Sequence, residues 1–298
     1  MNKEQWLKHK VWIGLQTFFL VMAMSMLLGT LGWVIAGGAM AIFVLGLMIG
    51  SYFFLPKISP HFLLRMNRCR ELKPYETPNI HGVVHALAKR ANFSNLPTLY
   101  YLPSNQLTAF TAGTIDNGAI ALSDGLLRNL NLKEVAGVLG HEMSHLKNDD
   151  LKVLSFADVS SRVTGILSLI GQFLLLLNLP LVLFMNYQFN WLIILLLIFA
   201  PHIGDFLFFT LSRTREYDAD LGAAELTGDP EGLASALYKI QQHQNSVLKQ
   251  ALFRGYRVTE PVLMRTHPPT KERIRRLLEV GGNKSETYRL PARTTWNA

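Results

Sequence analysis

Four long stretches of almost uninterrupted apolar residues separate the chain into membrane-like and polar parts. Two of them adjoin each other near the N-terminus, at residues 11–30 and 31–55, and two lie further on, at residues 163–185 and 191–211. Such runs suit helices that cross a hydrocarbon layer of about 30 Å. The pattern therefore predicts four transmembrane helices arranged as two hairpins.

Lysine and arginine lie outside these hairpins and are absent from their inner loops, which are expected around residues 29–32 and 186–190. The first and second hairpins are flanked by Lys3, Lys8, Lys10, Lys57, Arg65, Arg68, Arg70, Lys73, Arg162, Arg213 and Arg215. By the positive-inside rule, both termini and all of the polar sequence lie in the cytosol. The net charge of +8 is suited to a bilayer with an anionic cytosolic face.

The overall composition supports a membrane protein and excludes other classes. The chain is 49% hydrophobic and only 17% charged, which is more apolar than a soluble domain of this length. Cys69 is the single cysteine, so an internal disulfide is excluded. No basic stretch is interleaved with base-stacking aromatic residues, and we therefore expect no nucleic-acid partner.

The polar sequence is expected to form one cytosolic domain that the second hairpin interrupts. The predicted parts are an N-terminal hairpin at 1–55, a first catalytic part at 56–160, the second hairpin at 161–211 and a second catalytic part at 212–298. Thr77-Pro78 has the pattern of a helix start. Short β-like runs at 99–102, 107–111 and 119–122 follow, the last two separated by Asp-Asn-Gly turn chemistry. These patterns predict a mainly α protein with a small antiparallel β-sheet, hence an α+β domain.

The sequence "HEMSH" carries the clearest chemical signal. Asn131 and Glu134 form a capping-box pattern, which predicts a helix start just before it. On that helix His141 and His145 share one face and can bind one ion, while Glu142 can take a proton from a metal-bound water. The similarly spaced "HGVVH" has Gly82 in place of the glutamate, so an ordinary exposed helix face is favoured there.

A catalytic zinc needs a third protein ligand, and a glutamate from another helix can supply it. A continuation with a third histidine is excluded, because Asn148 and Leu151 occupy the places of the required glycine and histidine. "SRTREYDAD" offers Glu216 as the ligand and Asp220, one turn later, as an acceptor that would orient a ligand imidazole. Taken alone, this stretch also suits an ordinary solvated helix start. A tight second hairpin would bring it next to His145.

Three separated motifs, "HEMSHLKNDD", "SRTREYDADLGA" and "THPPTKERIRRL", occur together with the two pairs of apolar stretches. In this the chain resembles the HtpX-type membrane zinc endopeptidases, relatives of the CAAX prenyl protease and of the mitochondrial inner-membrane stress protease. The resemblance implies a zincin-like domain with one Zn²⁺ per chain on His141, His145 and Glu216, and Glu142 as general base. It further implies supporting roles for Asn148, Asp150 and Asp220, and oxyanion stabilisation by His267 or Arg273. The His-Pro-Pro stretch could instead be a rigid lead-in to a helix.

The resemblance also implies a substrate-binding strand at Thr108, Ala109, Phe110 and Thr111. Relatives show a stretch similar to Asn-Ala-Phe-Ala-Thr-Gly there, whereas this chain has Thr108 in place of the asparagine. An edge strand can pair with an extended peptide through its backbone, so pairing would survive this change. A contact from the asparagine side chain would be lost.

Together these features predict a multi-pass endopeptidase of the bacterial inner membrane that cleaves peptides or membrane proteins at the cytosolic face. By resemblance, its role would be quality control of damaged or misfolded membrane proteins. Three alternatives remain open. They are cleavage within the bilayer, CAAX-type processing of prenylated tails, and a catalytically silent membrane adaptor with the same fold.

Overall fold

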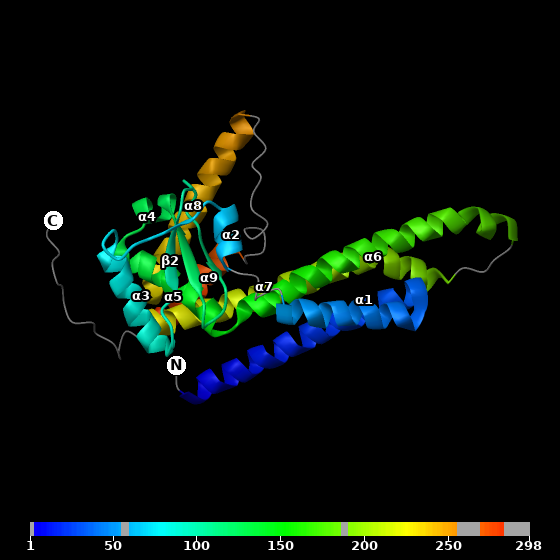
Figure 1. Ribbon diagram of the computed structural model, residues 1–298, viewed down its shortest axis with the longest axis horizontal. Coiled ribbons are helices and arrows are strands. Elements are labelled where there is room, and N and C mark those ends of the chain that lie inside the picture. The colour runs from blue at the N-terminus through cyan, green and yellow to red at the C-terminus, as the bar shows by residue number, and fades with distance from the viewer. Residues whose placement is uncertain (1–2, 55–59, 186–189, 255–268, 283–298) are drawn as a thin grey trace.

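The computed structural model describes residues 3–54, 60–185, 190–254 and 269–282. In these ranges a bundle of long helices extends from a mixed domain of shorter helices and a small sheet (Figure 1). The helices are α1 Lys3–Phe54, α2 Pro60–Met66, α3 Pro78–Ala91, α4 Asp124–Asn129, α5 Leu132–Lys147, α6 Asp150–Met185, α7 Trp191–Thr227, α8 Pro230–Arg254 and α9 Thr270–Gly282. The strands are β1 Arg70–Glu71, β2 Thr98–Leu102, β3 Ala109–Ala112 and β4 Ala119–Ser123.

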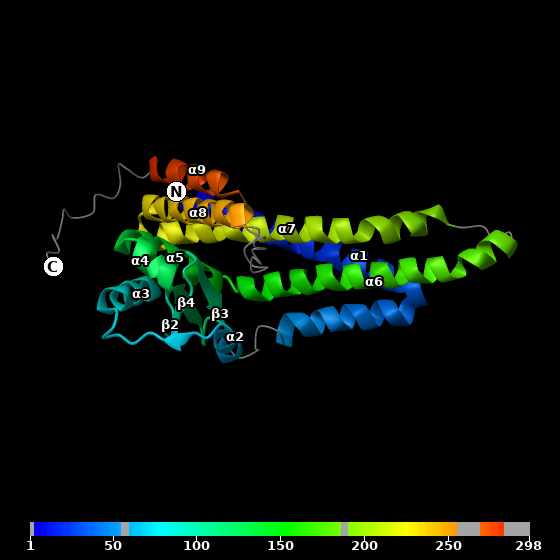
Figure 2. The same cartoon turned by 90° about the horizontal axis from the view of Figure 1, so that it is seen from above.

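Three helices in the described ranges, α1, α6 and α7, are long and apolar enough to cross a membrane, where the sequence predicted four. They lie side by side along the length of the molecule in two perpendicular views (Figures 1 and 2). The difference lies in α1, which leaves helical geometry at Ala36 and Gly37 and folds back. Gly37 has φ +75°, a conformation that glycine adopts at little cost.

The bend in α1 was expected near residues 29–32, and that expectation is wrong. Gly29 and Gly32 instead let the two arms of α1 approach each other. A Cβ on Gly32 would lie 3.0 Å from the Cα of Ala41 on the returning arm. Small residues at such contacts permit close packing of apolar helices.

Helices α6 and α7 continue from the apolar bundle into the mixed domain. Helix α6 begins at Asp150, and α7 runs without interruption to Thr227, so the boundary predicted between residues 211 and 212 falls inside a helix. The segment from Leu211 to Glu216 holds neither glycine nor proline that would end a helix. Gly228, at φ +72°, ends α7, and Pro230 begins α8. The sequence Gly228-Asp229-Pro230 therefore separates the two helices.

The sheet is mixed, not antiparallel as predicted, and its strand order is β1-β2-β4-β3. Strands β3 and β4 form the predicted antiparallel hairpin, and β1 is antiparallel to β2. Strands β2 and β4, however, pair in parallel, with Leu99 beside Ile120. The hydrophobic pattern cannot distinguish the two directions, because both place alternate residues on the same face. Strand β3 lies at an edge of the sheet.

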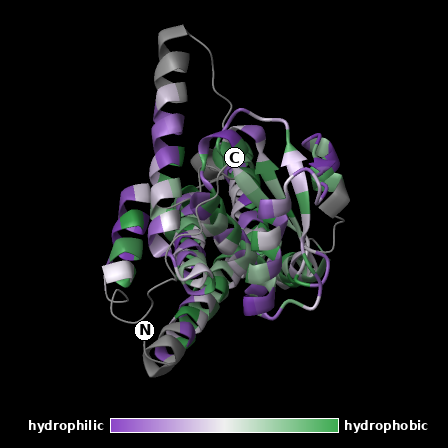
Figure 3. Ribbon diagram, turned by 90° about the vertical axis from the view of Figure 1, so that its left-hand side faces the viewer, coloured by the Kyte–Doolittle hydropathy of each residue, from purple (hydrophilic) through white to green (hydrophobic). Residues whose placement is uncertain are grey.

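Helix α5 lies in the centre of the mixed domain and contacts α3, β3, α7 and α8. Leu139, Met143 and Leu146 of this helix are fully buried in a core that also includes Ile120 and Leu126. Burial of one such side chain contributes about 1.5–3 kcal/mol. Seen from the end that carries this domain, hydrophobic and hydrophilic stretches alternate along its helices (Figure 3).

Candidate metal centre

The interaction of Asn131 with Glu134 fixes where α5 begins, and therefore which residues this helix buries. The Asn131 side chain accepts a hydrogen bond from the backbone N–H of Glu134 at 3.0 Å, and the Glu134 carboxylate accepts one from the Asn131 N–H at 2.8 Å. This confirms the capping box. Three turns later, His141, Glu142 and His145 are all buried, with exposed fractions of 6%, 8% and 8%.

The two imidazoles face each other on one side of α5. Their Nε2 atoms are 3.1 Å apart, and their rings are nearly perpendicular, at 86°. The carboxylate of Glu216, on α7, lies 3.5 Å from Nε2 of His141 and 3.7 Å from Nε2 of His145. Among the described residues, these three form the one cluster of His, Cys, Asp and Glu whose ligand atoms all lie within 4.8 Å of one another.

Each imidazole is held at its other nitrogen by a buried aspartate. Nδ1 of His145 lies 2.7 Å from Asp150, and Nδ1 of His141 lies 3.0 Å from Asp220. We assign the Nδ1–H tautomer to both rings, because a carboxylate only accepts hydrogen bonds. Nε2 of each imidazole is then the position left for a metal ion or a proton.

This donor set fits a zinc ion. Two imidazole lone pairs that face each other next to a carboxylate repel one another unless a cation or a proton lies between them. Imidazole nitrogen and carboxylate oxygen are ligands that Zn²⁺ prefers, and three protein ligands are typical of its catalytic sites. The aspartates on His141 and His145 match the acceptors that usually orient zinc-binding histidines.

The electrostatics of His141 favour a positive charge at this position. Burial lowers the pKa of His141, but hydrogen bonds to Asp220 and Glu216 outweigh burial and raise the pKa to about 10. Burial raises the pKa of Asp220, whereas the charge of Arg273 and its hydrogen bonds lower it. The cluster is thus built to hold a cation between its carboxylates.

Arg273 lies beside the ligand cluster and contacts its carboxylates. It comes from α9, is 5% exposed, and makes two hydrogen bonds to Asp220, at 2.8 and 2.7 Å. Its NH1 lies 3.1 Å from Glu216. This arrangement suits a residue that positions Glu216 and Asp220. His267, the other residue expected to stabilise an oxyanion, lies outside the described residues.

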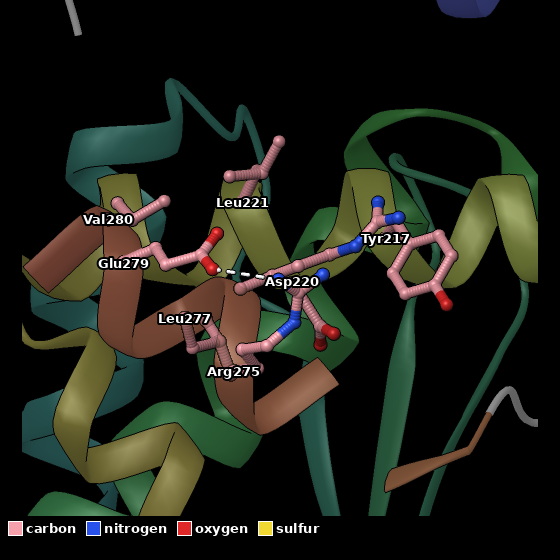
Figure 4. Close-up of a pocket in the computed structure, with 8 residues that line it drawn as sticks. Tyr217, Asp220, Leu221, Arg275, Leu277, Glu279 and Val280 are labelled. Atoms are coloured by element: carbon pink, nitrogen blue, oxygen red, sulfur yellow. Dashed lines mark hydrogen bonds and ion pairs between the residues drawn. The ribbon is translucent and has the colours of Figure 1, made fainter. Parts of the chain in front are cut away.

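A pocket of about 490 Å³ lies between α7 and α9, behind Asp220 (Figure 4). Its wall from α7 includes Tyr217, and Arg276 of α9 lies 3.9 Å over the Tyr217 ring. On the α9 side, Arg275 and Glu279 form an ion pair at 3.1 Å. Asp220 links the pocket to the cluster. The contact between Arg276 and Tyr217 helps to keep α9, and with it Arg273, against α7.

Glu142, the expected general base, lies beside the edge strand β3. The hydroxyl of Thr111 donates a hydrogen bond to the Glu142 carboxylate at 2.9 Å. Thr108 precedes β3. Its backbone N–H donates a hydrogen bond to the Ser123 hydroxyl, and its carbonyl accepts one from the Ser123 N–H on the neighbouring strand. Ala109 and Phe110 are half-buried. The strand expected to bind substrate therefore adjoins the expected base.

Two of the three expected supporting residues contact a ligand imidazole, and the third does not. Asp150 and Asp220 do so, whereas the Asn148 side chain donates a hydrogen bond to Asp218 at 3.1 Å.

Sequence reasoning missed Asp218 and Arg215, which were attributed to a solvated helix start. Both are buried, and Arg215 binds Asp150. Their spacing of three residues on α7 was the available signal, since it puts them on one helix face.

Comparisons with known proteins agree with this arrangement. The sequence model of the protein family described as "Peptidase family M48" matches residues 74–280. A "Protease HtpX homolog" of Campylobacter hominis is 33% identical over 287 residues, covering 89% of this chain and 98% of that protein. A second one, of Desulfatibacillum aliphaticivorans, is 30% identical over 306 residues and covers 95% of each chain.

Among solved structures, the crystal structure of S. mikatae Ste24p is similar with a TM-score of 0.43 and 16% identity, covering 93% of this chain and 66% of that one. The family model spans more than half of the sequence and includes α5, the Glu216 segment of α7 and most of α9, up to residue 280. The chain therefore belongs to peptidase family M48.

Proposed function

We propose that this protein is a membrane-anchored zinc endopeptidase that hydrolyses peptide bonds at the cytosolic face of the bacterial inner membrane. The single observation that carries this proposal is the buried cluster of His141, His145 and Glu216, with Glu142 next to it on α5. Membership of a peptidase family and the apolar helices α1, α6 and α7 support a membrane protease.

His141, His145 and Glu216 would hold the ion, which in such sites lowers the pKa of water and polarises a substrate carbonyl. Glu142 would accept the proton of the attacking water and pass it to the leaving amine. Thr111 would hold the Glu142 carboxylate in place through its hydroxyl. Arg273 would keep Glu216 and Asp220 oriented, because its guanidinium contacts both carboxylates.

The edge strand β3 is the proposed docking place for an extended substrate. Its inner edge is paired with β4, so its outer edge offers backbone groups to a peptide. Thr111 belongs to β3 and touches Glu142, so a peptide on this edge would pass close to the base. An unfolded segment suits this mode because an extended strand requires no structure of its own.

We propose that the site lies near the membrane surface. The two arms of α1 together with α6 and α7 would provide four crossings, with both termini on the cytosolic side. Helix α2 buries Leu64 against the sheet but exposes Phe62, Leu63 and Met66, at 59%, 43% and 66%. This short helix follows the second arm of α1, and Arg65 lies in its last turn. Apolar residues next to basic ones suit the interface of an anionic bilayer.

Because β3 packs against α2, the proposed docking edge lies close to this interface. Damaged or misfolded membrane proteins are therefore the proposed substrates, since their exposed segments emerge from the bilayer there. His141 and His145 lie on α5, outside the three apolar helices, and Glu216 lies in the part of α7 that continues into the mixed domain, which favours cleavage at the surface over cleavage within the bilayer.

The proposal is tested with a Glu142→Gln variant of the full-length chain, purified in detergent, and Glu231→Gln as the matched control, since Glu231 is exposed. Zinc content is measured together with cleavage of an unfolded model protein. We expect Glu142→Gln to keep zinc and lose cleavage at least about a hundredfold, the scale of general-base catalysis. Undiminished cleavage by Glu142→Gln would exclude the proposed role of this residue.

A further inference from the structure

The start of the first apolar helix reaches the surroundings of the metal cluster. Nζ of Lys10, on α1, lies 3.0 Å from both carboxylate oxygens of Asp218 on α7. It also lies 3.4 Å from the side-chain oxygen of Asn148, the residue that ends α5. The Lys10 side chain is 31% exposed, whereas that of Asp218 is 3% exposed. Lys10 is thus distant in sequence from Asp218 but contacts its buried carboxylate on α7.

Asp218 is connected to the ligand His145 through two more charged side chains. Arg215 lies 3.4 Å from Asp218 and also contacts Asp150, with a hydrogen bond of 2.5 Å from its Nε. Asp150 in turn binds Nδ1 of His145 at 2.7 Å. The exposed fractions of Arg215 and Asp150 are 7% and 0%. The chain of contacts therefore runs Lys10, Asp218, Arg215, Asp150, His145.

The charges along this series of contacts balance. It contains two cations, Lys10 and Arg215, and two carboxylates, Asp218 and Asp150. Arg215 is shared between both carboxylates, and its shorter contacts are to Asp150. A buried carboxylate that loses its cationic partner is strongly destabilised, because burial has already removed its water. Without Lys10, Asp218 would compete with Asp150 for Arg215.

We propose that Lys10 is a positioning residue for the metal centre. By neutralising Asp218, it leaves Arg215 on Asp150, and Asp150 then holds the His145 imidazole with Nε2 toward His141 and Glu216. The N-terminal segment that enters the membrane thereby completes the site, so metal affinity depends on how α1 is seated against α7. This inference rests on the proposed metal function and extends it to a residue outside the family match, which begins at residue 74.

The test compares Lys10→Met with Lys10→Arg in the full-length chain in detergent micelles. Lys147→Met is the matched control, because Lys147 is an exposed lysine at the end of α5 close to Asn148. Metal-free protein is titrated with Co²⁺, whose visible absorption reports the geometry of its ligands, and kcat and KM are then measured with zinc. The Co²⁺ spectrum would not respond to a role of Lys10 that is only structural.

We expect Lys10→Met to weaken Co²⁺ affinity about tenfold, the lower end for residues that support metal ligands. Its Co²⁺ spectrum should change and kcat should fall while KM stays within about twofold of wild type. Lys10→Arg, which keeps the charge, should restore affinity and spectrum, and Lys147→Met should match wild type. Equal affinity and spectra for Lys10→Met and Lys147→Met would overturn the inference.

A double variant keeps the inference testable if Lys10→Met does not fold. Lys10→Met with Asp218→Asn removes one charge of each sign, so Arg215 should stay on Asp150 and Co²⁺ affinity should return to within about twofold of wild type. A double variant that binds Co²⁺ about tenfold more weakly than wild type would overturn the charge-balance argument. If the wild type itself binds no Co²⁺, the proposed function fails, which is distinguishable from a failure at Lys10 alone.

Discussion

Asp150 binds Nδ1 of His145 at 2.7 Å although it lies only five positions further along the chain. The contact forms because Asp149 adopts a left-handed conformation, with φ 54°, between the end of α5 and the start of α6. This turn brings the first residue of a membrane helix back to the metal face of α5. The helix that anchors the chain therefore also orients one of its proposed ligands.

Asp150→Asn removes the charge that holds the His145 imidazole and binds Arg215. We expect zinc affinity to fall about 10–100-fold, the usual effect of losing such a partner. Asp149→Asn is the control, because the Asp149 side chain is 45% exposed and asparagine tolerates its left-handed backbone. Competition with a fluorescent zinc chelator measures both. Equal affinity in the two variants would mean that Asp150 does not orient His145.

Thr111→Val keeps the shape of the side chain but removes the hydroxyl that bonds Glu142. Such a bond to a charged group contributes about 1.5–3 kcal/mol, so we expect kcat to fall about tenfold while KM changes little. Thr111→Ser, which keeps the hydroxyl, should restore kcat. Steady-state kinetics on a peptide substrate measure the effect. A fall in kcat that Thr111→Ser fails to restore would argue for a packing role.

Gly137→Ala tests how closely α5 and α8 pack. A Cβ on Gly137 would lie 2.7 Å from the backbone nitrogen of Leu233, so α8 would have to move. We expect a loss of about 1–3 kcal/mol in the free energy of unfolding. At Gly82 of α3 no atom lies within 4 Å of a built Cβ, and Gly82→Ala should preserve or raise stability. Thermal unfolding of both variants measures the difference, and equal Tm values would contradict the close contact.

Zinc binding should depend on pH through His141, whose pKa is raised from 6.5 to about 10. Because the imidazole holds a proton below that pH, zinc must displace it, and zinc affinity should rise about tenfold per pH unit. The raised pKa stabilises the metal-free fold below pH 6.5, and this contribution is lost as the pH rises toward about 10. Zinc titrations at pH 6.5, 7.5 and 8.5 measure the slope.

Asp220→Asn weakens the hydrogen bond that contributes most to raising the pKa of His141. The slope of zinc affinity against pH should therefore be shallower in this variant. A wild-type affinity that does not change over the same range of pH would show that His141 holds no proton to displace.

Much of the cluster was visible in the sequence because its chemistry is local to two helices. The spacing of His141 and His145 puts both on one helix face, and the capping box marks where that helix starts. Glu216 followed from the requirement for a third ligand and from the hairpin that brings α7 back to α5. Arg215 and Asp218 were missed because, in sequence, a buried ion network has the same composition as a solvated helix start.

The parts of the fold that were predicted wrongly depend on long-range packing. Gly29 and Gly32 resembled a turn, but they serve helix contact, and the bend lies at Ala36 and Gly37. The direction in which β2 pairs with β4 depends on the connection between them and not on their residue patterns. The contact of Lys10 with Asp218 joins segments far apart in sequence, so no local pattern could indicate it.

The central claim is that His141, His145 and Glu216 hold one zinc ion, and zinc content per chain tests it most directly. Glu216→Ala is compared with Glu225→Ala, which alters an exposed glutamate on the same helix. After dialysis against a weak chelator, elemental analysis should find about one zinc per chain in wild type and Glu225→Ala, and almost none in Glu216→Ala. Equal zinc retention by Glu216→Ala and wild type, or no zinc in wild type, would contradict the account.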